Sequence, residues 1–253
     1  MGGDTLSDSS TARPWIIPYG TAAWSADRLG SVTDEAGGRH LAARTPYVVA
    51  DPAAATPVRL GDPDWRFGGA PDLATNTDTP SRLRLLSMEL ALHADTWDRA
   101  TRGFLDAYMA FALAATDNAT LSRRAARFGG LFAPQDWAFA AYRPLPRAQL
   151  LAAGTAWAAA DAAEASVPVS AALWTGRALV AVELPGASTP TMRRRQALAR
   201  LPEAGIMLVT LEAAGLADPA VLARRLPGEV TDFWREVDAP PSPFVQPVPA
   251  PAA

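Results

Sequence analysis

The longest regular pattern of apolar positions runs from about Ser81 to Ala115, where apolar residues recur alternately three and four positions apart. Thr79 has a side chain suited to cap a helix, and Pro80 suits the first helical position, where a missing N–H costs nothing. Gly103 is a place where such a helix can kink or divide. The stripe consists of Leu83, Leu86, Leu90, His93, Trp97, Ala100, Phe104, Ala107, Phe111 and Ala114. This spacing predicts a long helix whose apolar side packs along another helix.

A second helix is predicted from about Ala119 to Phe128. It is followed by Gly129-Gly130, and glycine readily takes the left-handed conformation that ends helices. The two predicted helices make residues 81–130 a helical hairpin.

The N-terminal part of the chain has no periodic segment long enough to build its own core. Residues 1–12 are small and polar, which predicts a disordered leader and no secretory signal. Residues 13–80 are broken by proline at short intervals, which predicts a loop-rich arm that wraps over another part of the protein. Short extended segments fit at 15–17, 47–50 and 58–60.

The apolar period changes after residue 130, where an α/β domain is predicted to extend from 131 to 238. Strands are predicted at 138–142, 167–174, 177–184 and 206–211, and helices at 189–201, 220–226 and 229–237. The tail from 239 to 253 is rich in proline, which predicts an extended, solvated segment. The expected fold class is therefore mixed α+β or α/β, with flanking helices on a mixed sheet, preceded by the helical hairpin and the arm.

Composition removes many kinds of chemistry. All 23 basic residues are arginine, 55 residues are alanine, and cysteine is absent, which is typical of a GC-rich bacterial genome. The lack of cysteine excludes a disulfide framework and cysteine-bound zinc. Only two histidines are present, and no phosphate loop or dinucleotide fingerprint occurs. We expect no cofactor and no bound metal.

Charge is distributed unevenly along the chain, whose net charge is -3. Residues 81–150 carry nine arginines against six acidic residues, whereas the segments on either side are acidic. The middle segment is therefore the candidate anion-binding surface. No apolar run approaches the length of a membrane span, so we expect a cytoplasmic protein without membrane contact.

The strand-strand-helix-strand-helix order predicted for 167–226 resembles the C-terminal half of the restriction-endonuclease-like fold, in the branch of very-short-patch-repair-type nucleases. The residues that carry the resemblance are Ala178–Gly186, Arg193–Leu198 and Ala204–Leu211, and the similarity covers about residues 131–226. The resemblance implies a strand that delivers a carboxylate, then a basic helix and a closing strand.

The chain departs from this family at the residues that perform catalysis. Glu183 matches the second metal-binding acid, but Pro185 stands where the family has lysine, and the first strand, around Ser170–Leu173, has no aspartate. One carboxylate does not hold Mg²⁺ against water. The resemblance therefore implies a degenerate core without its active site. The alternative to a catalytic role for Glu183 is an ion pair with an arginine such as Arg193.

Three further places carry residues suited to a catalytic or metal site. His93 follows Glu89 by one helical turn, which suits a shared metal, but its place on the apolar stripe favours a core or interface residue. His40 lies in a predicted loop, where it is either a base or a surface residue. The stretch from Asp62 to Asp72 lacks the ligand register of a calcium loop and favours a structured turn.

Arginine clusters are the remaining candidate binding residues. Arginine binds phosphate and carboxylate in a bidentate manner, and a neighbouring tryptophan could add stacking. The candidates are Arg123, Arg124, Arg127, Arg143, Arg147, Arg193, Arg194, Arg195 and Trp137. The alternative is that they form solvated helix faces and internal ion pairs.

These observations favour a non-catalytic binding or scaffold protein, acting as an accessory subunit of a larger complex. Its partner would be another protein or a second copy, bound through the stripe from 83 to 114. One alternative is a metal-dependent hydrolase that combines Glu183 with loop acids such as Asp62 or Asp72. The other is a nucleic-acid-binding protein that uses the arginine clusters.

Overall fold

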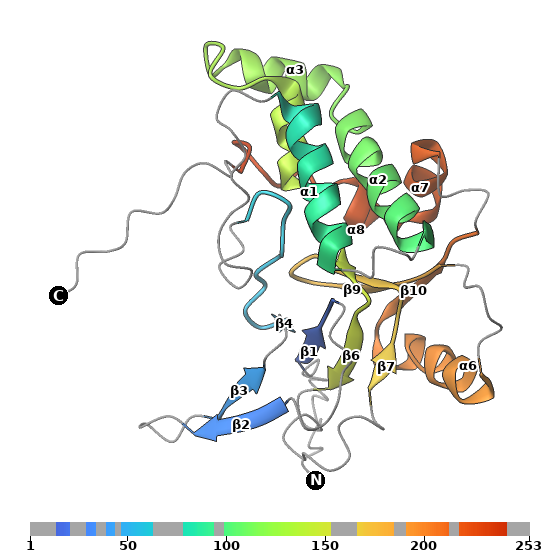
Figure 1. Ribbon diagram of the computed structural model, residues 1–253. Coiled ribbons are helices and arrows are strands. Elements are labelled where there is room, and N and C mark those ends of the chain that lie inside the picture. The colour runs from blue at the N-terminus through green and yellow to red at the C-terminus, as the bar shows by residue number, and fades with distance from the viewer. Residues whose placement is uncertain are drawn as a thin grey trace, which may run out of the picture.

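A helical layer lies against two small β-sheets (Figure 1). The computed structural model describes residues 14–20, 29–33, 39–43, 47–62, 78–93, 99–152, 166–184, 191–212 and 218–241. The expected leader at 1–12, the loop from 63 to 72 and most of the proline-rich tail lie outside the described residues. The mixed α+β class is confirmed, and within the described residues no helix is long and apolar enough to cross a membrane.

Most of the helices lie in one half of the molecule (Figure 1). They are α1 (Thr79–His93), α2 (Arg99–Ala114), α3 (Ala119–Ala126), the 3-10 helix η3 (Pro134–Ala140), α7 (Pro219–Arg225) and α8 (Gly228–Thr231). The helix α6 (Met192–Ala199) lies instead beside the sheets and is followed by the short 3-10 helix η4 (Pro202–Ala204).

The strands form two four-stranded sheets and a separate hairpin. The first sheet has the order β4-β1-β6-β7, with β4 (Tyr47–Ala50), β1 (Trp15–Pro18), β6 (Gln149–Ala152) and β7 (Val167–Pro168). The second has the order β10-β9-β8-β5, with β10 (Met207–Thr210), β9 (Leu179–Glu183), β8 (Ala171–Trp174) and β5 (Leu145–Pro146). The hairpin pairs β2 (Leu29–Thr33) with β3 (Arg39–Ala43).

The second sheet is the central layer of the molecule. Successive side chains of a strand point to opposite faces. Leu173 and Val180 accordingly join the core beneath the helices, whereas Trp174 and Ala181 join the core shared with the first sheet. Both faces of β8 and β9 are therefore covered, which explains why these strands read as continuous apolar runs.

The predicted order of strands and helix in the C-terminal half is present from β8 onward. The single strand expected at 167–174 is wrong, because β7 belongs to the first sheet and β8 to the second. β8 and β9 form an antiparallel hairpin, and β9 pairs in parallel with β10. α6 lies between β9 and β10 in the chain, as a parallel connection requires. This arrangement places Glu183 at the carboxyl end of β9, opposite Thr210.

The predicted continuous helix from 81 to 115 is wrong, because two helices take its place. α1 ends at His93 and α2 begins at Arg99, so the break does not fall at Gly103, which lies inside α2. The two helices pack against each other. Leu83, Leu86, Leu90, Phe104, Ala107 and Phe111 of the predicted stripe are buried in the chain's own core.

Of the shorter strands predicted from the sequence, two are confirmed and one is wrong. The strands expected at 15–17 and 47–50 are confirmed as β1 and β4, and β1 lies between β4 and β6 of the later chain. The strand expected at 138–142 is wrong, since most of it belongs to η3. Pro134 opens η3, and the Asp136 carboxylate accepts a hydrogen bond from the Ala133 backbone N–H at 2.8 Å.

Candidate functional site

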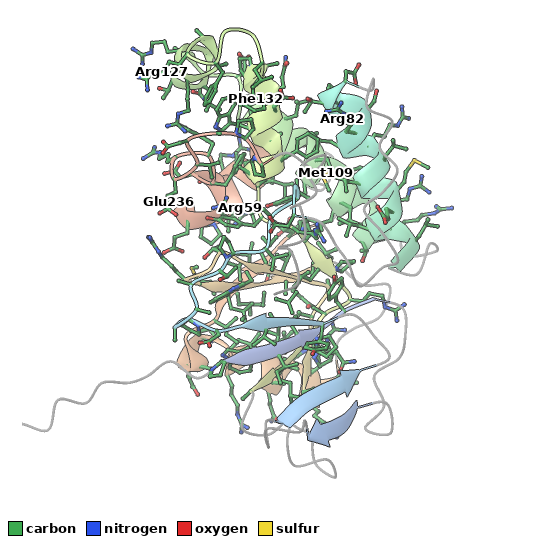
Figure 2. All side chains as sticks on the ribbon, turned by 90° about the vertical axis from the view of Figure 1, so that its left-hand side faces the viewer. Arg59, Arg82, Met109, Arg127, Phe132 and Glu236 are labelled. Atoms are coloured by element: carbon green, nitrogen blue, oxygen red, sulfur yellow. The ribbon has the colours of Figure 1, made fainter. Side chains whose placement is uncertain are left out.

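α1 carries apolar side chains on two opposite faces. Leu83, Leu86 and Leu90 enter the core. On the other side Leu85, Met88 and Leu92 are exposed by 41%, 51% and 68%. These three residues, spaced three and four positions apart, share one side of the helix and are called the outer α1 face. Figure 2 shows α1, marked by Arg82, along one edge of the molecule with side chains projecting outward.

Sequence reasoning missed the outer α1 face because it followed only the longest stripe. Leu85, Met88 and Leu92 fall between the positions of that stripe. A helix with one buried face normally has polar residues opposite it. The signal that would have revealed the second face is a second set of apolar residues opposite the first one on α1. The residue Arg84, also exposed, borders the outer α1 face on one side.

A second exposed surface lies at the end of α3. Asn118 begins this helix, and its side-chain oxygen accepts a hydrogen bond from the Leu121 N–H at 2.9 Å. Gly129 and Gly130 follow the helix with φ of 60° and 88°, the left-handed conformation expected from the sequence. The turn leaves Leu131 73% exposed.

Aromatic rings form the base of this turn. The ring centroids of Phe128 and Phe132 are 5.2 Å apart, and those rings lie 6.1 Å and 6.2 Å from the ring of Trp137. Trp137 is fully buried, whereas Phe128 and Phe132 are half-buried. We call the exposed surface made by Arg123, Arg127, Phe128, Leu131 and Phe132 the α3 tip. Figure 2 shows Arg127 at the outer edge of the molecule.

Two of the predicted binding residues act inside the fold instead. The Arg124 guanidinium donates hydrogen bonds to the carbonyl oxygens of Trp234 at 2.9 Å and Val237 at 2.5 Å. The Trp137 indole N–H donates to the same Val237 carbonyl at 3.0 Å. These bonds hold the C-terminal segment against α3 and η3, so a stacking role for Trp137 has no accessible ring to support it.

Arg143 is also part of the interior. It is only 6% exposed, and its guanidinium donates to the backbone carbonyl of Asp62. Arg59 lies beside it, donating to the Ala140 carbonyl at 2.6 Å and stacking over the Tyr142 ring at 5.2 Å. Burial raises the pKa of the Asp62 carboxyl, although the Arg59 N–H and both guanidinium groups oppose the rise. Arg147, by contrast, is exposed.

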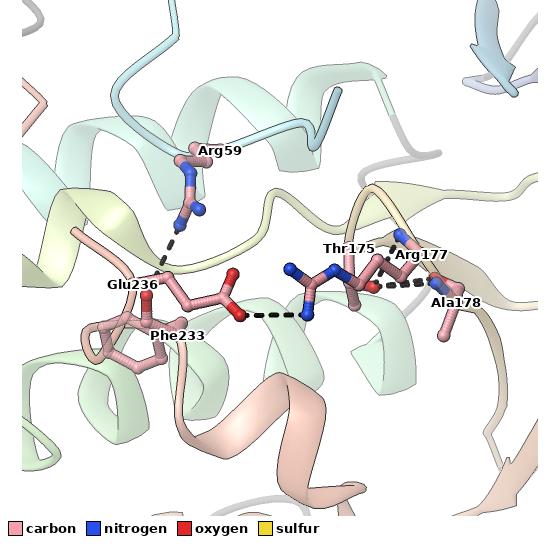
Figure 3. Close-up of polar contacts among 6 residues, drawn as sticks. All are labelled: Arg59, Thr175, Arg177, Ala178, Phe233 and Glu236. Carbon is pink, nitrogen blue, oxygen red and sulfur yellow. Dashed lines mark hydrogen bonds and ion pairs between the residues drawn. The ribbon is translucent and has the colours of Figure 1, made fainter. Parts of the chain in front are cut away.

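The C-terminal segment connects this interior network to the central sheet (Figure 3). Arg59 reaches the Phe233 carbonyl at 3.4 Å. Arg177, at the turn between β8 and β9, forms an exposed ion pair with Glu236 at 3.2 Å. The Thr175 hydroxyl shapes that turn by accepting a hydrogen bond from the Ala178 N–H at 2.9 Å.

Glu183 is paired with an arginine of α6. The partner is Arg194, not the Arg193 given as an example from the sequence, and the two charged groups are 2.6 Å apart. Burial raises the pKa of the Glu183 carboxyl, while the Arg194 charge lowers it in part. In the described part of the chain, no group of three histidine or acidic residues is placed to hold a metal ion. Asp62 lies in the interior network with Arg59 and Arg143, and Asp72 lies outside the described residues.

The arginine clusters do not form one surface. α3, which carries Arg123 and is followed directly by Arg127, lies at one end of the molecule, and α6, with Arg193, Arg194 and Arg195, lies near the opposite end (Figure 1). Neither histidine belongs to an arginine cluster in the sequence. His93 ends α1, and His40 lies on β3 opposite Val32, not in a loop as expected. Neither imidazole is among the side chains that the structure describes.

Comparison with known protein families, curated proteins and solved structures finds no match to this chain. Function must therefore be inferred from the residues and their geometry.

Proposed function

We propose that this chain is a non-catalytic binding protein, an accessory subunit that contacts a partner protein through the outer α1 face. The observation that carries the proposal is the exposure of Leu85, Met88 and Leu92 on one side of a helix whose other side is already buried. Placing three large apolar side chains in a row on the surface exposes apolar area to water, which is unfavourable unless another surface covers it.

The spacing of these residues fits a known mode of recognition. A helix that docks against an apolar groove or another helix makes contact through positions i, i+3 or i+4, and i+7. Leu85, Met88 and Leu92 occupy positions i, i+3 and i+7. Methionine has an unbranched, polarisable side chain, which adapts to the shape of an interface.

Charge favours a different protein over a second copy as the partner. In an antiparallel two-fold pair of helices, the same flank of each copy meets on the same side of the interface. The exposed Arg84 of both copies would then share one side, where like charges repel. A partner with an acidic residue beside its apolar surface fits the outer α1 face better.

The two alternatives receive less support from the arrangement of charged groups. A hydrolase built on Glu183 needs further acids around it, but its carboxylate is 2.6 Å from Arg194. A nucleic-acid surface needs its arginines along one path of phosphates. Arg124, Arg143 and Arg194 are bonded to groups of their own chain, and α3 and α6 lie far apart.

The proposal retains the resemblance to a degenerate nuclease-like core. The hairpin of β8 and β9, the helix α6 and the parallel strand β10 are the parts of the fold that support it. In this reading Glu183 has kept its place at the end of β9 but is paired with Arg194 in place of a metal.

The test is a comparison of two charge substitutions. Met88→Glu places a carboxylate on the outer α1 face, whereas Met192→Glu makes the same change on α6, where Met192 is 77% exposed. We expect wild type and Met192→Glu to capture the same protein from host lysate in near-equal amounts, and Met88→Glu to lose at least about tenfold, because a buried carboxylate without a partner costs more than about 1.4 kcal/mol.

Circular dichroism and thermal unfolding would verify that both variants fold, since both positions are exposed. Equal capture by the two variants contradicts the proposal. Self-association that is lost in Met88→Glu alone, measured by light scattering, would show that the face binds a second copy and would overturn the accessory role.

A further inference from the structure

We infer that the α3 tip is a second docking site, and that it takes an acidic segment of a partner protein. The site combines exposed positive charge with one projecting apolar side chain. Arg123 and Arg127 are exposed, and a separation of four residues places them on the same side of α3. Leu131 lies four positions further along the chain, immediately after the glycine turn.

Positive charge at the α3 tip is not neutralised by the chain itself. Arg123 and Arg127 form no ion pair with any residue that the structure describes, and Arg123 uses only its Nε–H, on the Ala119 carbonyl at 3.3 Å. Arg124 donates to neutral carbonyl groups, which leaves its positive charge uncompensated. No acidic residue lies between Asp117 and Asp136 in the sequence. In the C-terminal segment that packs on α3, Glu236 is paired with Arg177 and Asp232 with Arg235. Exposed positive charge therefore remains at Arg123 and Arg127, and carboxylates complement it.

The apolar part of the site rests on a rigid base. Phe128 and Phe132 pack edge to face at 5.2 Å and both contact the buried Trp137. Leu131 lies between these two phenylalanines in the sequence, and its side chain is 73% exposed. An exposed apolar residue on an ordered turn, with guanidinium groups nearby, is suited to a peptide that presents carboxylates and an aliphatic residue within one or two helical turns.

The same observations disfavour nucleic acid as the ligand. Base stacking requires an accessible aromatic face. The Trp137 ring is fully buried, and the Phe128 and Phe132 rings are engaged with it and with each other. Two exposed arginines also offer few phosphate contacts, and the chain as a whole has a net charge of -3.

The inference is tested with a fluorescein-labelled helical peptide of about 20 residues that carries glutamates four positions apart and leucines one turn away. A matched peptide has glutamine in place of every glutamate. Binding to the full chain is followed by fluorescence anisotropy at low and at high salt. We expect the glutamate peptide to bind, the glutamine peptide to bind weakly, and added salt to weaken the interaction.

The decisive variants remove the same number of charges from two similar helix ends. Arg123→Gln with Arg127→Gln changes the α3 tip, and Arg224→Gln with Arg225→Gln changes the exposed end of α7. The first pair should weaken peptide binding about three- to tenfold, as expected for two exposed ion pairs, and the second pair should leave it nearly unchanged. Leu131→Ser should weaken binding while leaving its salt dependence intact.

Several results would overturn the inference. They are equal losses in the two double variants, equal binding of the two peptides, and no binding of the glutamate peptide at low salt. Binding of single-stranded DNA or of anionic vesicles that depends on Arg123 and Arg127 in place of peptide binding would also overturn it. The outer α1 face is also apolar and bordered by an arginine, so Met88→Glu serves as the control for peptide binding at that face. This variant should bind the peptide like wild type, and a loss of binding in Met88→Glu with none in the Arg123→Gln, Arg127→Gln protein would overturn the inference. The two proposals can therefore fail separately.

Discussion

Lysine is absent from this protein, so arginine carries the permanent positive charge, and individual arginines perform different tasks. Arg194 pairs with a carboxylate, Arg124 bonds two backbone carbonyls, and Arg59 bonds a carbonyl while it covers an aromatic ring. The planar guanidinium has five N–H donors, which suits it to several acceptors at once. The sequence showed where arginines cluster, but it could not show that Arg124 points inward while its neighbour Arg123 stays at the surface.

The ion pair of Glu183 predicts a dependence of stability on pH. Because burial raises the pKa of the Glu183 carboxyl above its ordinary value of 4.5, the folded protein binds this proton more tightly than the unfolded chain. The contribution of Glu183 to stability is therefore greatest at low pH and falls as pH rises through its folded pKa. Arg194→Met removes the opposing charge, so the pKa should rise further and the loss with pH should be larger.

Urea unfolding at several pH values measures this effect. Arg194→Met should be less stable than wild type by about 1–2 kcal/mol near neutral pH, a value reduced for the partial exposure of Arg194, and the difference should shrink at acidic pH. Adding Glu183→Gln to Arg194→Met should remove most of the pH dependence of this stability difference. A stability difference that does not change with pH would contradict the assignment.

At the scale of elements, the periodic segments were predicted better than the irregular ones. Alternating and continuous apolar runs located β8, β9 and β10, because buried strands leave a clear sequence pattern. A division of the long helix was expected at Gly103, but its position before Arg99 was missed because the apolar spacing continues across it. The end of the 3-10 helix η3 was assigned to a strand at 138–142 because the apolar residues from Ala138 to Tyr142 are continuous and show no helical period.

Two glycine substitutions form a matched pair, one in the turn between β8 and β9 and one inside α2. Gly176 has a φ of 89°, and a Cβ there would lie 2.7 Å from the Ala55 carbonyl oxygen. Gly103 lies inside α2 with open space where its Cβ would be. Gly176→Ala should destabilise the protein by about 1–3 kcal/mol, while Gly103→Ala should stabilise it by about 0.5–1 kcal/mol.

Thermal and urea unfolding of the two variants would measure these opposite changes. A Gly176→Ala protein as stable as wild type would show that the segment around Ala55 does not approach this turn.

For the whole molecule, the pairing of distant segments was the least predictable feature. β1 was recognised as a strand, but its position between β4 and β6 depends on contacts with a segment more than a hundred residues away. The apolar pattern of one segment does not specify a distant partner. For the same reason the sequence did not reveal that residues 233–237 pack against α3 and η3. There Arg124 and Trp137 donate hydrogen bonds to backbone carbonyls of this C-terminal segment.

Two neighbouring arginines test the importance of this C-terminal closure. Arg124→Met removes two hydrogen bonds to the carbonyls of Trp234 and Val237, which should cost about 1–3 kcal/mol. Arg123→Met, one residue away and exposed, should change stability by less than about 0.5 kcal/mol. Hydrogen exchange should accelerate in residues 233–238 of the first variant and stay slow in the second. Equal exchange in both would contradict a role for Arg124 in holding the segment.

Site-specific photo-crosslinking in the host cell tests most directly whether the outer α1 face binds another protein. A photoreactive phenylalanine analogue is placed at position 88 on α1 or, as a control, at position 192 on α6, since both native methionines are exposed. We predict a single dominant adduct between position 88 and one different protein, and no such adduct from position 192. Irradiation that gives no adduct at position 88, or the same adducts at both positions, would contradict it.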